Sequence, residues 1–265
     1  MSPRRGWPGD LWARLRAFRK ATDPLGVALP RARLLRYDGY AALQFRRGQT
    51  QSRMRTAEPD ALLIDYTRSM LGCLLFRPEP VRIGIIGMGG GSQVKFCHRY
   101  LPGTRLEVAE NHPGVIALRH AFGIPDDDAR LQVVLDDGAR FLRARPGRYD
   151  LLLVDGYDDA GIPEALSTQA YYDACRAALV EGGAMASNLH CADSEAHVAR
   201  LRRSFGHARV RVIGEARMKN QVAFAWTAEP ADEALAVAVS VLTEDARGVL
   251  EPILRRVAAA IAADG

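Results

Sequence analysis

The chain has 265 residues, of which 48% are apolar and 25% are charged, so it is long enough for one large globular domain with a small appendage. No apolar stretch reaches the roughly 20 residues that a membrane helix needs, and no signal peptide is evident, so we expect a cytoplasmic protein that does not contact a membrane. The cysteines form no C-x-x-C pair, so the sequence predicts no disulfide framework and no metal site. The four are Cys73, Cys97, Cys175 and Cys191.

The first part of the chain is strongly basic. Residues 1–60 carry a net charge of +8, whereas the rest of the chain carries −3. Within this part, "DLWARLRAFRKA" places apolar side chains on one helical face with arginines around it, which predicts an amphipathic helix. A basic helix can contact nucleic acid or a membrane surface, or it can pack on the protein itself or on a second copy. We expect the packing role and no nucleic-acid partner.

Residues 30–58 differ in pattern from the rest of the chain. Short alternating runs broken by Asp38-Gly39 and by Gly48 predict a small β-hairpin unit. Residues 59–76 then have apolar side chains at helical spacing, and "RPEP" ends that pattern.

From residue 81 the sequence alternates predicted strands and helices. The predicted strands are 81–87, 105–110, 130–138, 149–159 and 184–190. The predicted helices between them are 92–101, 113–123, 139–145 and 168–183. This alternation predicts a parallel sheet covered on both faces, with all strand carboxyl ends at one edge.

Two late strands, 208–214 and 221–227, are separated by six residues, which is too short for a helical crossover. They should therefore pair antiparallel, and the Ala-rich tail 231–263 should be helical. We predict an α/β fold: a Rossmann-like methyltransferase-type sheet, mostly parallel with an antiparallel hairpin at the end, preceded by a small N-terminal β-unit.

Residues that suit ligand binding come after three successive predicted strands. "IIGMGGGSQ" (85–93) comes after the first, and its glycines, Gly87 and Gly89 among them, could cradle a phosphate, hold an adenosyl cofactor or make a tight turn. Glu110 ends the second strand and can accept both ribose hydroxyl protons. Asp137-Gly138 ends the third, where a carboxylate can accept a hydrogen bond from an adenine amine or cap the next helix. Together these residues favour adenosine binding.

The fourth predicted strand ends in "VDGYDDAGIPEAL", which carries Asp155, Asp158 and Asp159. Crowded carboxylates attract a cation, and one of them can be shifted toward a neutral pKa and accept a proton. Both properties suit a small amine substrate, which must lose a proton before it attacks carbon.

This segment resembles the motif of the spermidine synthase (polyamine aminopropyltransferase) family, roughly D-x-x-D-P-x-G-P-A-E-x-L. Matching positions are Asp155, Asp158, Gly161, Glu164 and Leu166. Glu110 with Pro113, Asp137-Gly138 with the adjoining "RFL", and Gln51 after Gly48 also match the family.

The resemblance implies a role for each of these residues. Decarboxylated S-adenosylmethionine, or S-adenosylmethionine itself, would be held by Gln51, Gly87, Gly89, Glu110, Asp137 and Gly138. Asp155 would assist deprotonation of the attacking amine, and Asp158 and Tyr66 would help to place it. The family also suggests a homodimer. The domains so predicted are a basic helical segment (1–29), the β-hairpin unit (30–58) and an adenosyl-cofactor-binding α/β transferase domain (59–265).

The chain departs from the family where an amine would bind. Gly90 stands where the family has an aspartate that grips the aminopropyl group, and Tyr66-Thr67-Arg68 replaces Tyr-His-Glu. Three hypotheses therefore stay open at this point: aminopropyl transfer to an amine, methyl transfer from S-adenosylmethionine with Arg68 pairing a carboxylate, and a non-catalytic protein that binds an adenosyl ligand or a partner.

Overall fold

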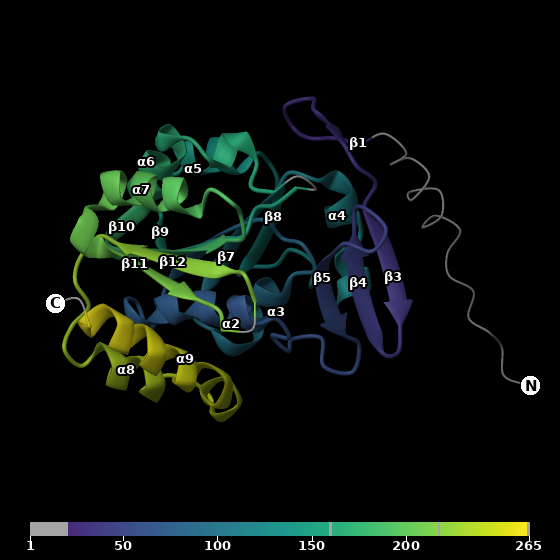
Figure 1. Ribbon diagram of the computed structural model, residues 1–265. Helices are drawn as coiled ribbons and strands as arrows, with labels where there is room; N and C mark the ends of the chain where they lie inside the picture. The colour runs from purple at the N-terminus through teal and green to yellow at the C-terminus, as the bar shows by residue number, and fades with distance from the viewer. Residues whose placement is uncertain (1–20, 159–160, 217, 264–265) are drawn as a thin grey trace, which may run out of the picture.

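The alternating second part of the chain folds into one seven-stranded sheet (Figure 1). The computed structural model describes residues 21–158, 161–216 and 218–263. The strand order is β11-β12-β10-β9-β6-β7-β8. Neighbours from β10 to β8 pair in parallel, whereas β12 is antiparallel to both β10 and β11. The predicted fold class is therefore confirmed, including the antiparallel hairpin at the end.

The large sheet contains β6 (Arg82–Ile86), β7 (Arg105–Glu110), β8 (Leu131–Leu135), β9 (Tyr149–Val154), β10 (Leu179–Leu189), β11 (Val210–Gly214) and β12 (Gln221–Trp226). The α-helices are α2 (Asp65–Met70), α3 (Ser92–Tyr100), α4 (Pro113–Ala117), α5 (Gly138–Arg143), α6 (Gln169–Ala178), α7 (Ser194–Phe205), α8 (Ala234–Ser240) and α9 (Glu244–Ala262). Short 3-10 helices are η2 (Leu71–Leu75), η3 (Arg119–Phe122), η4 (Glu164–Leu166) and η5 (His207–Arg209).

Helices cover both faces of the sheet, so its central strands are apolar on both sides (Figure 1). Successive side chains of a strand point to opposite faces. Ile85 and Leu153 therefore pack into the core beneath α2, α3 and α9, while Ile86 and Leu152 pack into the second core beneath α5, α6 and α7. This burial on both faces explains why the predicted strands read as nearly continuous apolar runs.

The N-terminal region forms a separate three-stranded antiparallel sheet, which stands beside the large sheet near α4 (Figure 1). Its strands are β3 (Arg33–Tyr37), β4 (Tyr40–Gln44) and β5 (Thr50–Arg55). The turn between β3 and β4 is Asp38-Gly39, at the turn signal in the sequence, with φ of 44° and 77°. The domain boundaries at 30–58 and 59–265 stay a prediction.

The predicted helical segment 1–29 is corrected in its last part. Residues 21–29 form the short antiparallel strands β1 (Ala21–Thr22) and β2 (Ala28–Leu29). The cause is a turn at Asp23, whose carboxylate accepts hydrogen bonds from the backbone N–H of Leu25 and Val27. The amphipathic pattern before residue 21 lies outside the described residues.

Other predicted helices are present with shorter bounds. The pattern at 59–76 becomes α2 followed by the 3-10 helix η2, and the tail 231–263 becomes α8 and α9. Among the residues that the structure describes, no helix is both long enough and apolar enough to span a membrane.

The central strand β6 contains Gly84, which allows close packing of its neighbour. A Cβ at this position would lie 2.6 Å from Leu152 Cδ2 and 3.2 Å from the Tyr149 ring. We therefore expect Gly84→Ala to lower the free energy of unfolding by about 1–3 kcal/mol, because overpacked cores must shift. The measurement is the urea midpoint. Gly103→Ala is the matched control, since a Cβ there meets nothing within 4 Å. Equal midpoints for the two variants would contradict this account.

Candidate active site

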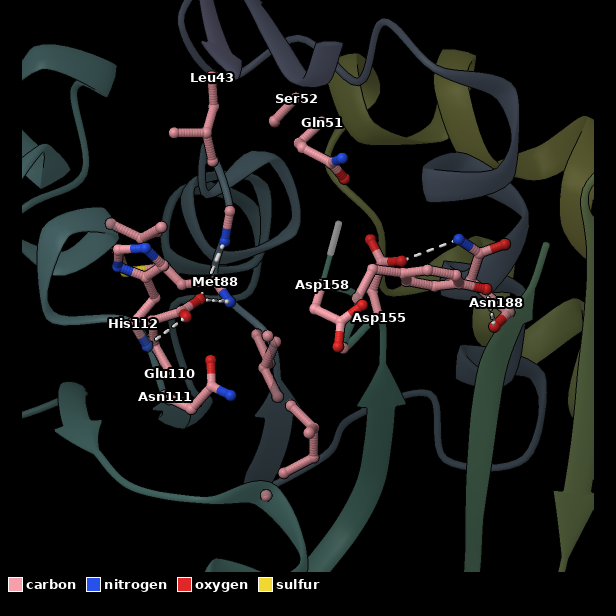
Figure 2. Close-up of a pocket in the computed structure, with 18 of the residues that line it drawn as sticks. Leu43, Gln51, Ser52, Met88, Glu110, Asn111, His112, Asp155, Asp158 and Asn188 are labelled. Carbon is pink, nitrogen blue, oxygen red and sulfur yellow. Dashed lines mark hydrogen bonds between the residues drawn. The ribbon is translucent and has the colours of Figure 1, made fainter. Parts of the chain in front are cut away.

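A cavity of about 490 Å³ lies at the carboxyl edge of the large sheet. The residues that line it lie at or just after the ends of β6, β7, β8, β9 and β10, which is where parallel sheets bind ligands. Leu43, Gln51 and Ser52 line it from the three-stranded sheet (Figure 2). Its size suits a small organic ligand rather than a single ion.

The glycine cluster after β6 brings the backbone close to neighbouring strands. Gly87 has a φ of 89°, and a Cβ on it would lie only 2.3 Å from the carbonyl oxygen of Asp155. Its N–H donates to the carbonyl of Ala109 at 2.8 Å, which extends the pairing of the sheet past the end of the strand. Glycine is thus required here by both sterics and backbone angle.

The loop amides face a carboxylate of the protein itself. The N–H groups of Met88 and Gly89 donate to Glu110 Oε2 at 2.9 and 3.4 Å, and the N–H of His112 donates to Oε1 at 2.9 Å (Figure 2). A phosphate placed on these donors would meet the charge of Glu110. This arrangement therefore disfavours the phosphate interpretation of the loop.

Glu110 is buried at the wall of the cavity. Burial raises the pKa of its carboxyl above the usual value, and the hydrogen bonds from Met88 and His112 oppose that rise. Each carboxylate oxygen accepts more than one hydrogen bond, so both oxygens can still accept hydrogen bonds from a ligand.

Asp137 lines the same cavity and also caps a helix. Its carboxylate accepts a hydrogen bond from the N–H of Arg140 at 2.9 Å, at the start of α5. The next residue, Gly138, begins the helix, and a Cβ there would lie 2.6 Å from Ile86 Cγ2. The structural and the ligand-binding interpretations of Asp137 are therefore compatible, and Glu110 and Asp137 share one cavity as the adenosine hypothesis requires.

Asp155 is half-buried and lies at the opposite side of the cavity from Glu110 (Figure 2). Tyr66 OH on α2 donates to its Oδ2 at 3.0 Å, and Asn188 Nδ2 on β10 donates to its Oδ1 at 2.8 Å. Burial raises the pKa of Asp155 above its usual value, while these two donors oppose the rise. Burial also raises the pKa of Tyr66 well above its usual value, so its hydroxyl stays protonated and can donate.

Behind Asn188 a second amide continues the chain of hydrogen bonds. Asn220 Nδ2 donates to Asn188 Oδ1 at 2.9 Å, and the backbone carbonyl of Asn220 accepts from the N–H of Glu215 at 2.9 Å. Arg256 on α9 in turn donates to Glu215 Oε1 at 2.9 Å. The carboxylate of Asp155 is thus oriented by residues from β10, the β11–β12 hairpin and the C-terminal helix.

The remaining predicted residues also lie at the cavity. Asp158 lines it, and its Oδ1 accepts a hydrogen bond from the N–H of Gly161 at 2.9 Å. Gln51 and Gly89 line it as well. Asp159 lies outside the described residues. The structure therefore brings all nine predicted site residues to one cavity, while their roles stay a proposal.

The two departures from the family have different surroundings. A Cβ at Gly90 would lie 2.5 Å from Ser52 Oγ, so Ser52 fills the space that a side chain at 90 would need. Arg68 pairs with Asp65 and donates to the carbonyl of Leu62 at 3.1 Å. Arg68 is not among the described residues that line the cavity.

Several lining residues were missed in the sequence. Asn188 and His190 lie at the end of the fifth strand, where the strand-end rule could have identified them. Ser52 and Asn220 carry no local signal, because they reach the cavity only through the packing of the small sheet and the final hairpin. The missed lining residues include Ser52, Asn111, Tyr157, Asn188, His190, Lys219 and Asn220.

Comparison with known proteins agrees with this geometry. Residues 74–204 match the spermine/spermidine synthase domain. This central part of the chain is therefore similar to the spermidine synthase family. A polyamine aminopropyltransferase of Chromobacterium violaceum is 33% identical over 172 residues, which cover 64% of this chain and 66% of that relative. The match therefore spans slightly less than two thirds of the relative's length.

Solved structures show the same fold. A probable spermidine synthase from Corynebacterium glutamicum superposes with a TM-score of 0.65 at 18% identity, covering 79% of this chain and 82% of the other. A spermidine synthase in complex with the transition-state analogue AdoDATO has a TM-score of 0.58 at 18% identity, covering 87% of this chain and 94% of the other. At these identities the likeness concerns the fold.

Glu110→Gln tests the cofactor half of the cavity. The amide has one acceptor oxygen in place of two charged ones, and it turns an NH₂ group toward backbone donors. We expect affinity for decarboxylated S-adenosylmethionine to fall at least tenfold, since a hydrogen bond to a charged group contributes about 1.5–3 kcal/mol. Titration calorimetry measures it.

Glu107→Gln is the control for this change. Glu107 lies on the same strand and pairs with Arg148 at 2.5 Å, and it is not among the described residues that line the cavity. That variant should lose stability and keep its affinity. If the two variants bind the ligand alike, Glu110 does not hold the ribose.

Proposed function

We propose that the protein transfers an aminopropyl group from decarboxylated S-adenosylmethionine to a primary amine. The observation that carries this proposal is the half-buried Asp155, held by Tyr66 and Asn188 in the cavity that also contains Glu110. The similarity of residues 74–204 to the spermine/spermidine synthase domain, and of the chain to a polyamine aminopropyltransferase, supports the same reaction.

The adenosyl half of the donor is assigned to the glycine loop side of the cavity. Glu110 would accept hydrogen bonds from the ribose hydroxyls, and Asp137 would accept one from the adenine amine through the oxygen that does not cap α5. Gln51 would contact the donor from β5, and Gly87, Gly89 and Gly138 would let the backbone approach it. When bound, the donor supplies a carbon activated by the adjacent sulfonium: the amine nitrogen bonds to that carbon, the carbon–sulfur bond breaks and its electron pair stays on sulfur.

Asp155 is the proposed base that takes a proton from the attacking amine. A primary amine is protonated at neutral pH and has no lone pair for attack, so a base must take one proton from it. The raised pKa of Asp155 makes its carboxylate a better proton acceptor than an exposed aspartate. Tyr66 and Asn188 hold that carboxylate in one orientation, and Asp158 adds a second negative charge that attracts the cationic amine.

The residues that would face the acceptor differ from those that the resemblance implies. Arg68 stands where the family has the acid that would attract a diamine, and it pairs with Asp65. With that acid absent, one carboxylate fewer attracts a second positive charge, which favours an acceptor that carries a single charged amine. The homodimer implied by the resemblance stays a prediction.

The methyl-transfer alternative depended on Arg68 pairing a ligand carboxylate. That guanidinium instead pairs with Asp65 and the carbonyl of Leu62. The geometry therefore gives methyl transfer no support beyond the shared fold.

Asp155→Asn tests the base. We expect turnover to fall by about 10²–10⁴, because general-base catalysis contributes a factor of that order, while affinity for the donor stays nearly unchanged. Steady-state kinetics and calorimetry provide the two measurements. Asp173→Asn is the control, since Asp173 lies on α6 and bonds Ser204. Normal turnover in Asp155→Asn would remove this residue from the mechanism.

The donors to Asp155 predict a pH effect. Tyr66 and Asn188 stabilise the charged carboxylate and so lower its pKa. Removing either donor raises that pKa, so the acidic limb of kcat/KM should move to higher pH in Tyr66→Phe and in Asn188→Ala. Comparing each variant with the unchanged protein on one amine cancels the titration of the amine itself.

Tyr100→Phe is the matched control for this shift. Tyr100 ends α3, and it is not among the described residues that line the cavity. An acidic limb that stays in place in both test variants would contradict the proposed role of Asp155 while leaving donor binding untouched.

A further inference from the structure

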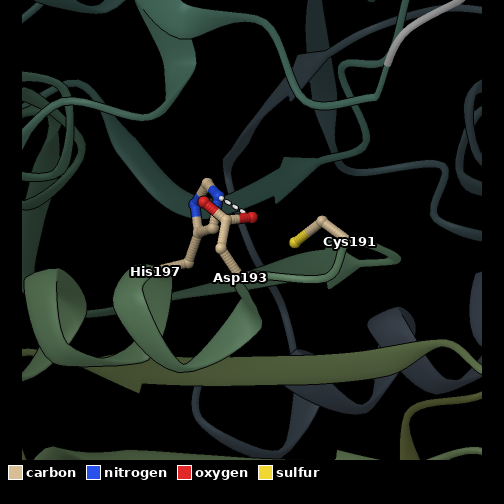
Figure 3. Close-up of side chains that lie close together, drawn as sticks. All are labelled: Cys191, Asp193 and His197. Atoms are coloured by element: carbon tan, nitrogen blue, oxygen red, sulfur yellow. Dashed lines mark ion pairs between the residues drawn. The ribbon is translucent and has the colours of Figure 1, made fainter.

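Three side chains with metal-ligating atoms converge where β10 leads into α7. Cys191 and Asp193 lie in the loop after β10, and His197 lies on the first turns of α7. The Sγ, carboxylate oxygen and ring nitrogen all lie within 4.8 Å of one another. Figure 3 shows the Cys191 sulfur pointing toward the Asp193 carboxylate, which lies beside the His197 ring. The sequence predicted no metal site because its cysteines form no C-x-x-C pair. This cluster instead has the spacing C-x-D-x-x-x-H.

His197 is held in the orientation that a metal ligand needs. Its side chain is buried, and its Nδ1 lies 2.6 Å from the hydroxyl of the buried Tyr172. With Nδ1–H donating to that hydroxyl, the lone pair of Nε2 faces Asp193 and Cys191. Histidines that bind metals are commonly fixed through their other ring nitrogen in this way.

The space between the ligands suits an ion. The Nε2 of His197 and the Oδ1 of Asp193 are 3.6 Å apart, which is too long for a good hydrogen bond. Ligands that share one tetrahedral ion stand at separations of this order, since zinc binds nitrogen and oxygen at about 2.0–2.2 Å. Asp193 is exposed and Cys191 is half-buried, so solvent can supply the ion and a fourth ligand.

We propose that Cys191, Asp193 and His197 form a binding site for one divalent cation of the zinc class, with the fourth position open to water. Thiolate and imidazole ligands select borderline-soft ions over calcium and magnesium, which prefer oxygen alone. Three protein ligands with one open position is a common zinc arrangement.

Such an ion would tie the end of β10 to α7 next to the cavity. Asn188 at the end of β10 orients Asp155, and the N–H of His190 donates to the Tyr157 hydroxyl at 2.7 Å. The ion would therefore reduce motion of the segment that carries Asn188 and His190. The site stands on its own residues and does not depend on the transferase proposal.

The test is a cobalt and zinc titration of the full 265-residue chain, prepared without an affinity tag and stripped with a chelator. We expect one Co²⁺ per chain, a cobalt–thiolate charge-transfer absorption in the near ultraviolet, and loss of that absorption when Zn²⁺ displaces Co²⁺. Cys191→Ser should abolish the absorption, and Asp193→Asn should weaken binding at least tenfold. His120→Gln is the matched control, because His120 is an exposed histidine beside Asp126 and should bind metal normally.

Two further measurements keep the proposal testable if a variant folds poorly. Tyr172→Phe preserves the shape of the side chain and should weaken binding about 10–100-fold, as loss of a supporting hydrogen bond does at other metal sites. Zn²⁺ should also slow labelling of Cys191, the one cysteine of the four that is not buried. Labelling that zinc does not slow, or an absorption that persists in Cys191→Ser, would overturn the proposal.

Discussion

The carboxylate of Glu110 and the backbone N–H groups that hold it are the interaction on which the site depends. Met88 and Gly89 donate to it from the glycine loop, and His112 donates from the start of α4. This contact joins the ends of β6 and β7 around one buried charge. A buried charge is tolerated only when several donors stabilise it. The glycines therefore have two structural effects. They let the loop turn inward, and they place its backbone N–H groups on the carboxylate of Glu110 instead of on a phosphate.

A second carboxylate, that of the half-buried Asp155, faces Glu110 across the cavity and has different partners. Burial raises the pKa of both Glu110 and Asp155. Rigid backbone amides hold Glu110, which suits a group that binds and stays charged. Side-chain donors, Tyr66 and Asn188, hold Asp155, which suits a group that gains and loses a proton. The two environments therefore differ in the way that the proposed binding role of Glu110 and the proposed base role of Asp155 require.

Much of the fold could be predicted from the sequence because the spacing of apolar residues differs between strands and helices. Each strand of the parallel sheet and the final hairpin were predicted, and the strand-end rule located Glu110, Asp137 and Asp155 in one cavity. The contacts that orient Asp155 could not be predicted, because Asn188 and Asn220 meet only after β10 pairs with β12. The cluster at Cys191 needs a buried tyrosine from a different helix, and residues 21–29 were misjudged because a turn at Asp23 overrode the composition of the segment.

Two departures from the family, Gly90 and Arg68, are not among the described residues that line the cavity. Position 90 lost an acid, and Ser52 from the small sheet fills the space. At position 68 an acid became a base, but Arg68 is paired with Asp65 away from the lining residues. A protein that had lost catalysis altogether would not be expected to keep a half-buried Asp155 with two donors, since removing a carboxylate from water costs stability. The altered residues therefore point to a changed acceptor, while the retained Asp155 points to a proton that must still be removed.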